Sequence, residues 1–275
     1  MSTQHLAVLG GGNMGRALIG GLLRRGTRPE HIGVGEPSAS RRADLSSELG
    51  VAASADNLLA IQRASLVVLA VKPQDVASVL APLRPFLERS RPLVVSIAAG
   101  IRLRSLASCC GARVPVVRAM PNAPALVGAG TTALFAPSEV SPAQRTQAER
   151  AMQAVGEVVW VASEDELDVV TALSGSGPAY FFLLAELMSQ GGIALGLDPA
   201  VARRLAVSTL HGAGQLVQVD GELERLRAAV TSPGGTTEAA LQHLQAANLP
   251  AIIAAAMSAA TRRSRELAAH ADAPR

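Results

Sequence analysis

Short apolar runs alternate with amphipathic stretches along roughly the first 160 residues of the chain. The segments between the runs, such as NMGRALIGGLLRRG and PQDVASVLAPLRPFL, place apolar residues at helical spacing. Near-continuous apolar strands separated by helices are typical of a parallel sheet that is covered on both faces. The pattern predicts strands over 5–10, 31–35, 65–71, 92–99, 114–120, 131–136 and 157–161.

The strand pattern ends near Ala162, and only helical periodicity follows. Helices are expected over 164–174, 177–197, 199–219, 222–230, 236–247 and 250–270. An alternating half followed by an all-helical half indicates two domains. We therefore predict an α/β domain with a doubly wound sheet over 1–162 and an all-α domain over 163–275.

Two of the predicted helices, containing YFFLLAELMSQGGIALGL and LPAIIAAAMSAA, are apolar over most of their circumference. Such helices need more cover than a thin bundle provides. A dimer interface through the helical domain would provide it. Packing of these helices on the first domain is the alternative that the pattern leaves open.

Composition and charge argue against a disordered, nucleic-acid-binding or membrane-spanning protein. Hydrophobic residues make up 49% of the chain, so a sizeable core can form. The net charge is only +3 and no basic run exceeds two residues, which argues against nucleic acid as a partner. We see neither a signal peptide nor a run of about 18 apolar residues, so we expect a cytoplasmic chain with no membrane partner. Cys109 and Cys110 are adjacent, which predicts two reduced thiols.

A glycine-rich motif follows the first predicted strand and opens a helix. Gly10, Gly12 and Gly15 fit G-x-G-x-x-G. The first glycine permits a tight turn, the second lets the backbone approach a pyrophosphate, and the third lets helix and strand pack closely. Glu36 ends the second strand about 20 residues on, where an acid can bind a ribose 2′-hydroxyl. The context predicts a Rossmann-type dinucleotide site.

The preferred dinucleotide remains open at this level. Glu36 repels a 2′-phosphate and favours NADH, whereas Arg41 and Arg42 follow closely and could pair with the phosphate of NADPH. Lys72, the sole lysine, stands in AVKPQ at the end of a predicted strand, and SIAAG ends the next strand. Ligands of open parallel sheets bind beyond those ends.

The chemistry lacks an obvious acid or base. The five histidines have no metal-ligand spacing, and no G-x-S-x-G elbow occurs between a strand and a helix, so we predict neither a metal site nor a serine hydrolase. A dinucleotide site without a proton-transfer residue suits reduction of an already protonated imine, because hydride alone completes that reaction.

The segment TSPGGTTEAAL, residues 231–241, places two glycines directly before a predicted helix. Backbone N–H groups and threonine hydroxyls at a helix start form an anion site suited to a carboxylate. A threonine that only caps the helix is the equally good alternative from physics alone.

At these residues the chain resembles the pyrroline-5-carboxylate reductase family almost from end to end. The matching segments are VLGGGNMGRAL, AVKPQ, SIAAG, RAMPNAPA, DVVTALSGSGPAYFFLLAE and LRAAVTSPGGTTEAALQHL. The resemblance implies hydride transfer from NADPH or NADH to C5 of L-1-pyrroline-5-carboxylate, giving L-proline in the last step of proline biosynthesis. It also implies a Rossmann domain and a helical domain that dimerises, with decamers built as pentamers of dimers in some members.

The resemblance also implies roles for individual residues. The substrate carboxylate would be bound by Ser232, Gly234, Gly235 and Thr236, with the Thr237 hydroxyl at the ring nitrogen as the catalytic group. This loop would come from the partner subunit, and Glu164 with the turn 174–178 would close the site. The residues expected at the cofactor are Gly10, Gly12, Asn13, Met14, Gly15, Glu36, Asn57, Ala70, Val71, Lys72, Pro73, Ala98 and Glu164.

Two positions depart from the family pattern. Ala123 replaces a common threonine near the cofactor, and Ala229 replaces an asparagine found in some members, so it is assigned no cofactor contact. A 3-hydroxyacid dehydrogenase shares the same layout but would want a catalytic lysine on the helical domain, where this chain has none. A dinucleotide-binding sensor without catalysis is the alternative outside the enzymes.

Overall fold

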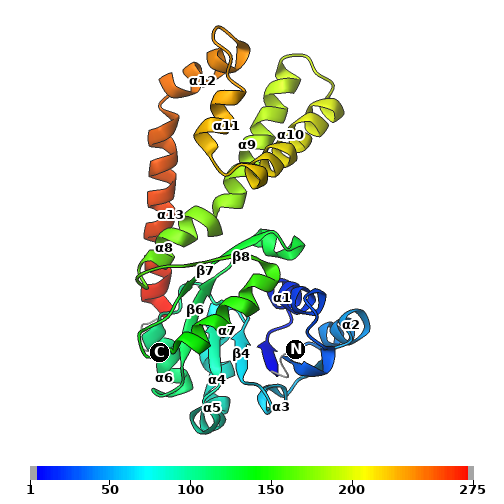
Figure 1. Ribbon diagram of the computed structural model, residues 1–275, viewed down its shortest axis with the longest axis vertical. Coiled ribbons are helices and arrows are strands. Elements are labelled where there is room, and N and C mark those ends of the chain that lie inside the picture. The colour runs from blue at the N-terminus through cyan, green and yellow to red at the C-terminus, as the bar shows by residue number, and fades with distance from the viewer. Residues whose placement is uncertain (1–4, 272–275) are drawn as a thin grey trace. The chain divides into compact units, whose positions relative to one another are not determined.

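The computed structural model describes residues 5–271 and contains one eight-stranded sheet (Figure 1). The strand order is β3-β2-β1-β4-β5-β6-β7-β8, and its first six strands have the order of a dinucleotide-binding sheet. All pairings are parallel except that of β6 with β7. The strands are β1 (Leu6–Leu9), β2 (Ile32–Gly35), β3 (Ala52–Ser54), β4 (Leu66–Leu69), β5 (Leu93–Ser96), β6 (Val116–Met120), β7 (Gly130–Phe135) and β8 (Gly156–Trp160).

Helices cover both faces of the sheet, as the continuous apolar strands predict. Leu6 and Val8 of β1 face a core that includes side chains of α1 (Asn13–Arg24), α2 (Ala39–Leu49) and α7 (Pro142–Met152). Ala7 and Leu9 face the opposite core. That second core is completed by α3 (Asn57–Ile61), α4 (Val76–Leu80), α5 (Arg84–Ser90) and α6 (Leu103–Cys110). The predicted doubly wound sheet is confirmed.

Short single-turn helices join several of these elements. The 3-10 turns are η1 (Pro29–His31), η2 (Pro73–Asp75), η3 (Ala81–Leu83), η4 (Ala123–Val127) and η5 (Gln153–Val155). After β8 the chain forms α8 (Glu166–Val170), which runs on into a π-helical turn, η6 (Thr171–Gly175). π-helical turns often lie at functional sites.

The remaining helices are α9 (Gly177–Ala194), α10 (Pro199–Val219), α11 (Leu223–Ala229), α12 (Thr236–Ala246) and α13 (Leu249–Ala271). They confirm the predicted all-helical second half. α9 and α10 pack together, and α10 begins with Pro199 in its first turn and Asp198 as its N-cap. The Asp198 carboxylate accepts hydrogen bonds from the N–H groups of Ala200 and Val201.

The chain divides into two compact units, and the division differs from the predicted domains 1–162 and 163–275. One unit extends to Gly175 and also includes the stretch from Ala260, and the other comprises Ser176–Ala259. Residues 1–4 and 272–275 of the predicted domains lie outside the described range. The end of α13 belongs to the sheet unit because its side chains form hydrogen bonds with residues of that unit. Helical periodicity in the sequence does not reveal such contacts.

The buried Asp168 carboxylate holds the end of α13 in the sheet unit. Asp168 is 3% exposed and accepts a hydrogen bond of 2.6 Å from the Ser264 hydroxyl. It also accepts one of 3.0 Å from the Arg102 guanidinium, on the segment that follows β5. α8, α13 and the loop after β5 are therefore joined at one buried charge, and such a charge needs these partners.

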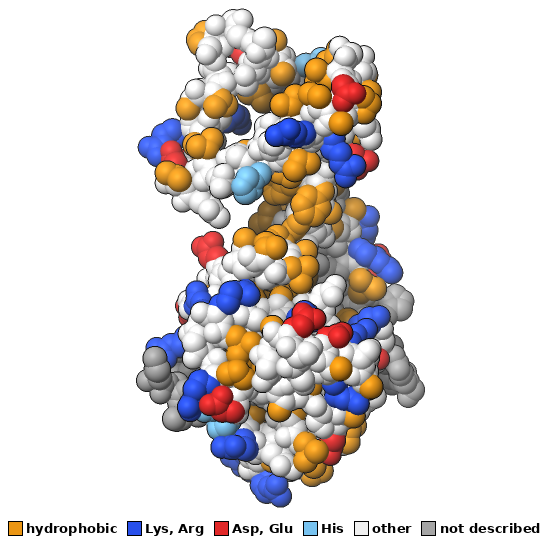
Figure 2. Space-filling view, turned by 90° about the vertical axis from the view of Figure 1, so that its right-hand side faces the viewer, with side chains coloured by type: hydrophobic (Ala, Val, Ile, Leu, Met, Phe, Trp, Pro, Cys, Tyr) orange, Lys and Arg blue, Asp and Glu red, His pale blue; other side chains and the backbone are white. Residues whose placement is uncertain are grey.

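The helical unit leaves many large apolar side chains uncovered. Phe181 and Phe182 of α9 are 60% and 61% exposed, and Leu183, Leu184 and Leu187 are each more than half exposed. Figure 2 shows hydrophobic side chains spread over the surface of these helices. Exposed apolar surface of this extent marks an interaction site.

Candidate functional site

The glycine-rich loop lies between β1 and α1. Gly10 has φ +104°, and a Cβ atom there would lie 2.4 Å from the carbonyl oxygen of Ala70. A Cβ at Gly15 would lie 2.0 Å from the carbonyl oxygen of Gly10, so the helix and strand pack as closely as predicted. Around Gly12, by contrast, a Cβ would meet nothing within 4 Å. Gly12 is the N-cap of α1, so an anion can approach the first N–H groups of the helix there.

Glu36 lies directly beside this loop and is 2% exposed. One carboxylate oxygen accepts the N–H of Gly11 at 2.8 Å, and the other accepts the N–H of Ser38 at 2.9 Å. A carboxylate has about four acceptor positions, so about two remain for a ligand. The acid at the end of β2 therefore fixes the glycine loop and keeps acceptor capacity for hydroxyl groups.

The two arginines that compete with Glu36 in the sequence have different environments. The Arg42 guanidinium donates to the carbonyl oxygens of Glu36 and Pro37 at 2.9 and 2.7 Å. The Arg41 guanidinium is 60% exposed and lies 3.6 Å from the Glu36 carboxylate. The Arg42 guanidinium is thus bound to backbone carbonyl groups, whereas that of Arg41 forms an ion pair with the Glu36 carboxylate.

The other residues expected at the cofactor also lie at the carboxyl edge of the sheet. Asn57 is the first residue of α3 and packs its amide against Gly35. The segment 70–73 follows β4 directly, with Ala70 hydrogen-bonded to Leu9 and Lys72 exposed. Ala98 follows β5 and is buried. The fold brings these residues to the edge that carries the glycine loop.

Glu164 has internal partners. Its carboxylate accepts the N–H of Leu103 at 2.7 Å and the guanidinium of Arg118 at 2.8 Å. Arg118 is on β6 and Leu103 begins α6, so Glu164 braces two elements at the carboxyl edge. Its expected part in closing the site stays a prediction.

The residues expected at the substrate carboxylate form a tight turn in the helical unit. The N–H of Gly235 donates to the carbonyl oxygen of Ser232 at 3.0 Å, and Gly234 at the third position has φ +71°. Proline second and a positive-φ glycine third are the sequence signature of a type II turn. α12 begins directly after this turn at Thr236, with Gly235 as its N-cap.

Glu238 fills part of the expected anion site. Its carboxylate accepts the N–H of Gly234 at 2.6 Å. The N–H groups of Gly234 and Gly235, both expected at the substrate carboxylate, are therefore occupied by internal hydrogen bonds. The N–H groups of Thr236 and Thr237, by contrast, have no acceptor among the residues that the structure describes. These orphan donors of the helix start, with the two threonine hydroxyls, remain available for a carboxylate.

Neither cysteine forms a disulfide in the described structure. Cys109 and Cys110 are free thiols, and burial together with neighbouring Cys109 raises the pKa of the Cys110 thiol to about 12. Cys110 is therefore an unreactive thiol at neutral pH. Among the side chains that the structure describes, no group of three or more His, Cys, Asp or Glu could hold a metal ion.

Sequence reasoning did not single out Glu238, Asp168 or Ser264. Glu238 carries a readable signal, because an acid at the third helical position commonly reaches back to the N–H groups before the helix. Asp168 and Ser264 are 96 positions apart and carry no such local signal.

Comparison with known proteins extends over nearly the whole chain. Residues 164–267 match the model for pyrroline-5-carboxylate reductase dimerisation, and residues 5–100 match that for coenzyme F420-dependent NADP oxidoreductase. The pyrroline-5-carboxylate reductase of Pseudomonas aeruginosa is 45% identical over 270 residues, which cover 98% of each chain.

Solved structures of pyrroline-5-carboxylate reductases also resemble this chain over nearly its whole length. A pyrroline-5-carboxylate reductase from Coxiella burnetii is 39% identical with a TM-score of 0.93, over 97% of this chain and 99% of that one. Plasmodium falciparum pyrroline carboxylate reductase with NADP bound is 27% identical with a TM-score of 0.82, over 98% of this chain and 99% of that one. This chain therefore belongs to the pyrroline-5-carboxylate reductase family.

Proposed function

We propose that this chain reduces L-1-pyrroline-5-carboxylate to L-proline with NADPH or NADH as the reductant. The observation that carries the proposal is the start of α12, where Thr236 and Thr237 present unpaired N–H groups and hydroxyls after a rigid turn. The substrate is a small cyclic imine with one carboxylate, and this helix start has donors for that carboxylate.

The residues of the sheet unit would hold the dinucleotide. Open space at Gly12 fits a pyrophosphate at the α1 N-terminus, together with Gly10, Asn13, Met14 and Gly15. The reduced nicotinamide, when bound, supplies a hydride to C5 of the protonated imine. The adenosine side would lie toward Glu36 and Asn57, and the nicotinamide side toward the segment 70–73, Ala98 and Glu164.

The substrate would be oriented by the turn before α12. Ser232 and Thr236 would bind its carboxylate, and Gly235, whose N–H donates to the carbonyl oxygen of Ser232, would hold the shape of the turn. Gly234 would join once the Glu238 carboxylate moves away from its N–H. The Thr237 hydroxyl would accept a hydrogen bond from the ring N–H, which holds the imine in its protonated form and stabilises the product amine. No proton transfer is needed in this step, because hydride addition to a protonated imine gives the neutral amine.

Substitution of Thr237 tests this assignment. In Thr237→Ala we expect kcat to fall about tenfold, which corresponds to the loss of one hydrogen bond to a charged group. The Thr237 side chain makes no hydrogen bond to another described residue, so the unfolding transition should not move. The measurement is substrate-dependent oxidation of NADH and of NADPH. Thr237→Ser keeps the hydroxyl and should retain most of the activity.

Two results would contradict the proposal. If the native chain oxidises neither cofactor when pyrroline-5-carboxylate is added, the proposed reaction is wrong and a non-catalytic dinucleotide-binding protein is favoured. If Thr237→Ala retains full kcat, the reaction stands but Thr237 has no part in it.

The contact between Glu238 and Gly234 leads to a second expectation. Glu238→Ala should lower KM for the substrate severalfold, because it frees the Gly234 N–H and removes a negative charge near the incoming carboxylate. Glu238→Gln keeps an acceptor but no charge, so it isolates the electrostatic part. Glu224→Ala, an exposed acid in the first turn of α11, is the matched control and should leave KM unchanged. A higher KM in Glu238→Ala would mean that Glu238 supports the substrate site instead of competing for it.

The exposed apolar helices support an oligomer. We propose a homodimer through the helical unit, whose residues match a dimerisation model, and a decamer formed as a pentamer of dimers. By length and composition one helix of the described residues, Glu166–Ala194, could also cross a membrane, and the bent pair Thr236–Ala246 and Leu249–Ala269 could form a second span. We assign this apolar surface to a second subunit, with neither membrane nor nucleic acid as a partner. Sedimentation velocity distinguishes a dimer from a decamer.

A further inference from the structure

A cavity of about 520 Å³ lies at the edge of the sheet opposite to the glycine loop. His5 and Leu6 line it where β1 begins, whereas the glycine loop follows the other end of that strand. Its other walls come from the turn after α1, the start of β4 and one face of α7. A volume of this size is typical of a site for a small organic molecule. None of the residues proposed above for the cofactor or the substrate lines it.

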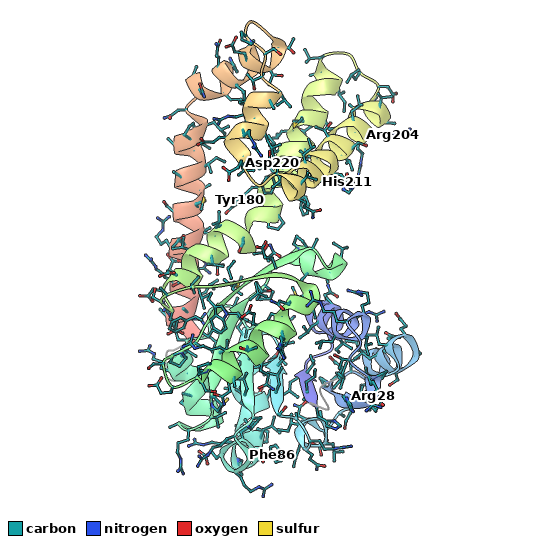
Figure 3. All side chains as sticks on the ribbon, viewed as in Figure 1. Arg28, Phe86, Tyr180, Arg204, His211 and Asp220 are labelled. Carbon is teal, nitrogen blue, oxygen red and sulfur yellow. The ribbon has the colours of Figure 1, made fainter. Side chains whose placement is uncertain are left out.

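The lining carries an excess of positive charge. Arg25, Arg28 and Arg150 line the cavity, and no Asp or Glu is among its described lining residues. Arg28, labelled in Figure 3, lies 3.3 Å from Glu30. The guanidinium groups of Arg25 and Arg150 have no hydrogen-bond or ion-pair partner among the residues whose side chains the structure describes. Two of the three guanidinium groups at this cavity are therefore uncompensated.

The histidines of the cavity respond to the same charges. The Arg28 guanidinium lies 3.0 Å from the Nε2 atom of His31. The rings of His31 and His5 pack edge to face, with 4.6 Å between their centroids. Burial and the nearby charges of Arg63, His31 and Arg28 lower the pKa of His5. Both rings thus lie beside arginine side chains, and the arginine at His31, Arg28, is also paired with Glu30.

The floor of the cavity is apolar. Leu6, Leu22, Leu66 and Ala151 are each at most 8% exposed and also belong to the wall. Arginines at the rim over an apolar floor fit a ligand with an anionic group and a carbon skeleton. We propose that this cavity is a second binding site for a small organic anion that carries carboxylate or phosphoryl oxygens.

The position of the cavity separates this ligand from the cofactor. α1 has its N-terminus at the glycine loop, and Leu22 and Arg25 at its other end line the cavity. A helix of 12 residues is about 18 Å long, so both ligands can be bound at once. α1 is closely packed between the two sites: Gly21 lies so near the carbonyl oxygen of Ala154 that a Cβ there would collide with it.

Calorimetric titration of the full chain, with NADH saturating its dinucleotide site, tests the proposal. Citrate serves as the carboxylate probe and glycerol 3-phosphate as the phosphoryl probe, with neutral glycerol for comparison. We expect one of the two anions to bind with a Kd below about 1 mM and glycerol not to bind. The stronger of the two anions identifies the kind of oxyanion that the site takes.

Paired variants locate the binding. Arg25→Gln with Arg150→Gln should weaken the anion at least about tenfold. Arg89→Gln with Arg113→Gln removes the same charge from exposed arginines that do not line the cavity, and should leave the Kd unchanged. Equal weakening in both pairs, or no binding of either anion by the native chain, would overturn the proposal. The outcome is independent of the proposed reductase activity, because no substrate is present.

Discussion

Gly15→Ala is expected to destabilise the sheet unit by about 3 kcal/mol and to abolish dinucleotide binding. The new Cβ would lie 2.0 Å from the carbonyl oxygen of Gly10, and the positions of both atoms are fixed by the backbone. No side-chain rotation can relieve that collision, so α1 must move away from β1. Denaturant unfolding measures the first effect, and quenching of NADH fluorescence measures the second.

Gly12→Ala is the matched control for this prediction. A Cβ at Gly12 meets nothing within 4 Å, and the backbone there has an ordinary φ of −68°. Stability should therefore change by less than about 1 kcal/mol. Dinucleotide affinity should nevertheless fall about a hundredfold, because the methyl group occupies the space through which a pyrophosphate reaches the helix start. Unchanged affinity in Gly12→Ala would place the pyrophosphate elsewhere.

Replacement of Glu36 is expected to reverse the preference between the two dinucleotides. The buried carboxylate suits the ribose hydroxyls of NADH and repels the 2′-phosphate of NADPH, so the native chain should use NADH efficiently. In Glu36→Ser the charge is gone and the Arg41 guanidinium, 3.6 Å from it in the native chain, becomes free for the phosphate. The ratio of kcat/KM for NADPH to that for NADH should rise about a hundredfold, as expected when a like charge a few ångströms away is removed.

Glu36 also holds the glycine loop in place, so this test needs a control for the loss of that support. Loss of its bonds to Gly11 and Ser38 should weaken both dinucleotides somewhat, so the ratio is the quantity to compare. Asp44→Ser removes an exposed acid from α2 and should leave the ratio unchanged. A native preference for NADPH that persists in Glu36→Ser would shift the discrimination to Arg41, and Arg41→Ala would then abolish it.

Local patterns predicted most of the sheet. Seven of the eight strands follow from apolar runs, and β3 was missed because Ala52–Ser54 has three small residues and little apolar signal. The antiparallel pairing of β6 with β7 was also missed. Nine residues lie between Met120 and Gly130, fewer than the dozen or more that a parallel crossover requires. The length of that connection is therefore a signal that the sequence does contain.

In the candidate site, too, local features could be predicted from the sequence, whereas contacts between distant segments could not. The positions of Gly10, Gly12 and Gly15 follow from local chain geometry, with close backbone contacts at Gly10 and Gly15 and open space at Gly12, whose pyrophosphate role stays a prediction. The contact between Glu238 and Gly234 is equally local but depends on a side-chain rotamer that a motif does not specify. The cavity at His5 is assembled from four distant segments, and none of them carries a motif.

The buried bond between Asp168 and Ser264 has a consequence for how the protein is made. The two residues are 96 positions apart, and a ribosome adds about 5 to 20 residues per second. For roughly 5 to 20 seconds after Asp168 is synthesised, the emerging chain therefore has a carboxylate without its hydroxyl partner. During that interval the sheet unit lacks only its last helix. The apolar helices α9 and α10 are synthesised in the same interval and are exposed as they emerge. Nascent chains should accordingly be most prone to aggregation or chaperone capture at this stage, and a chain truncated before Ser264 should remain in it permanently.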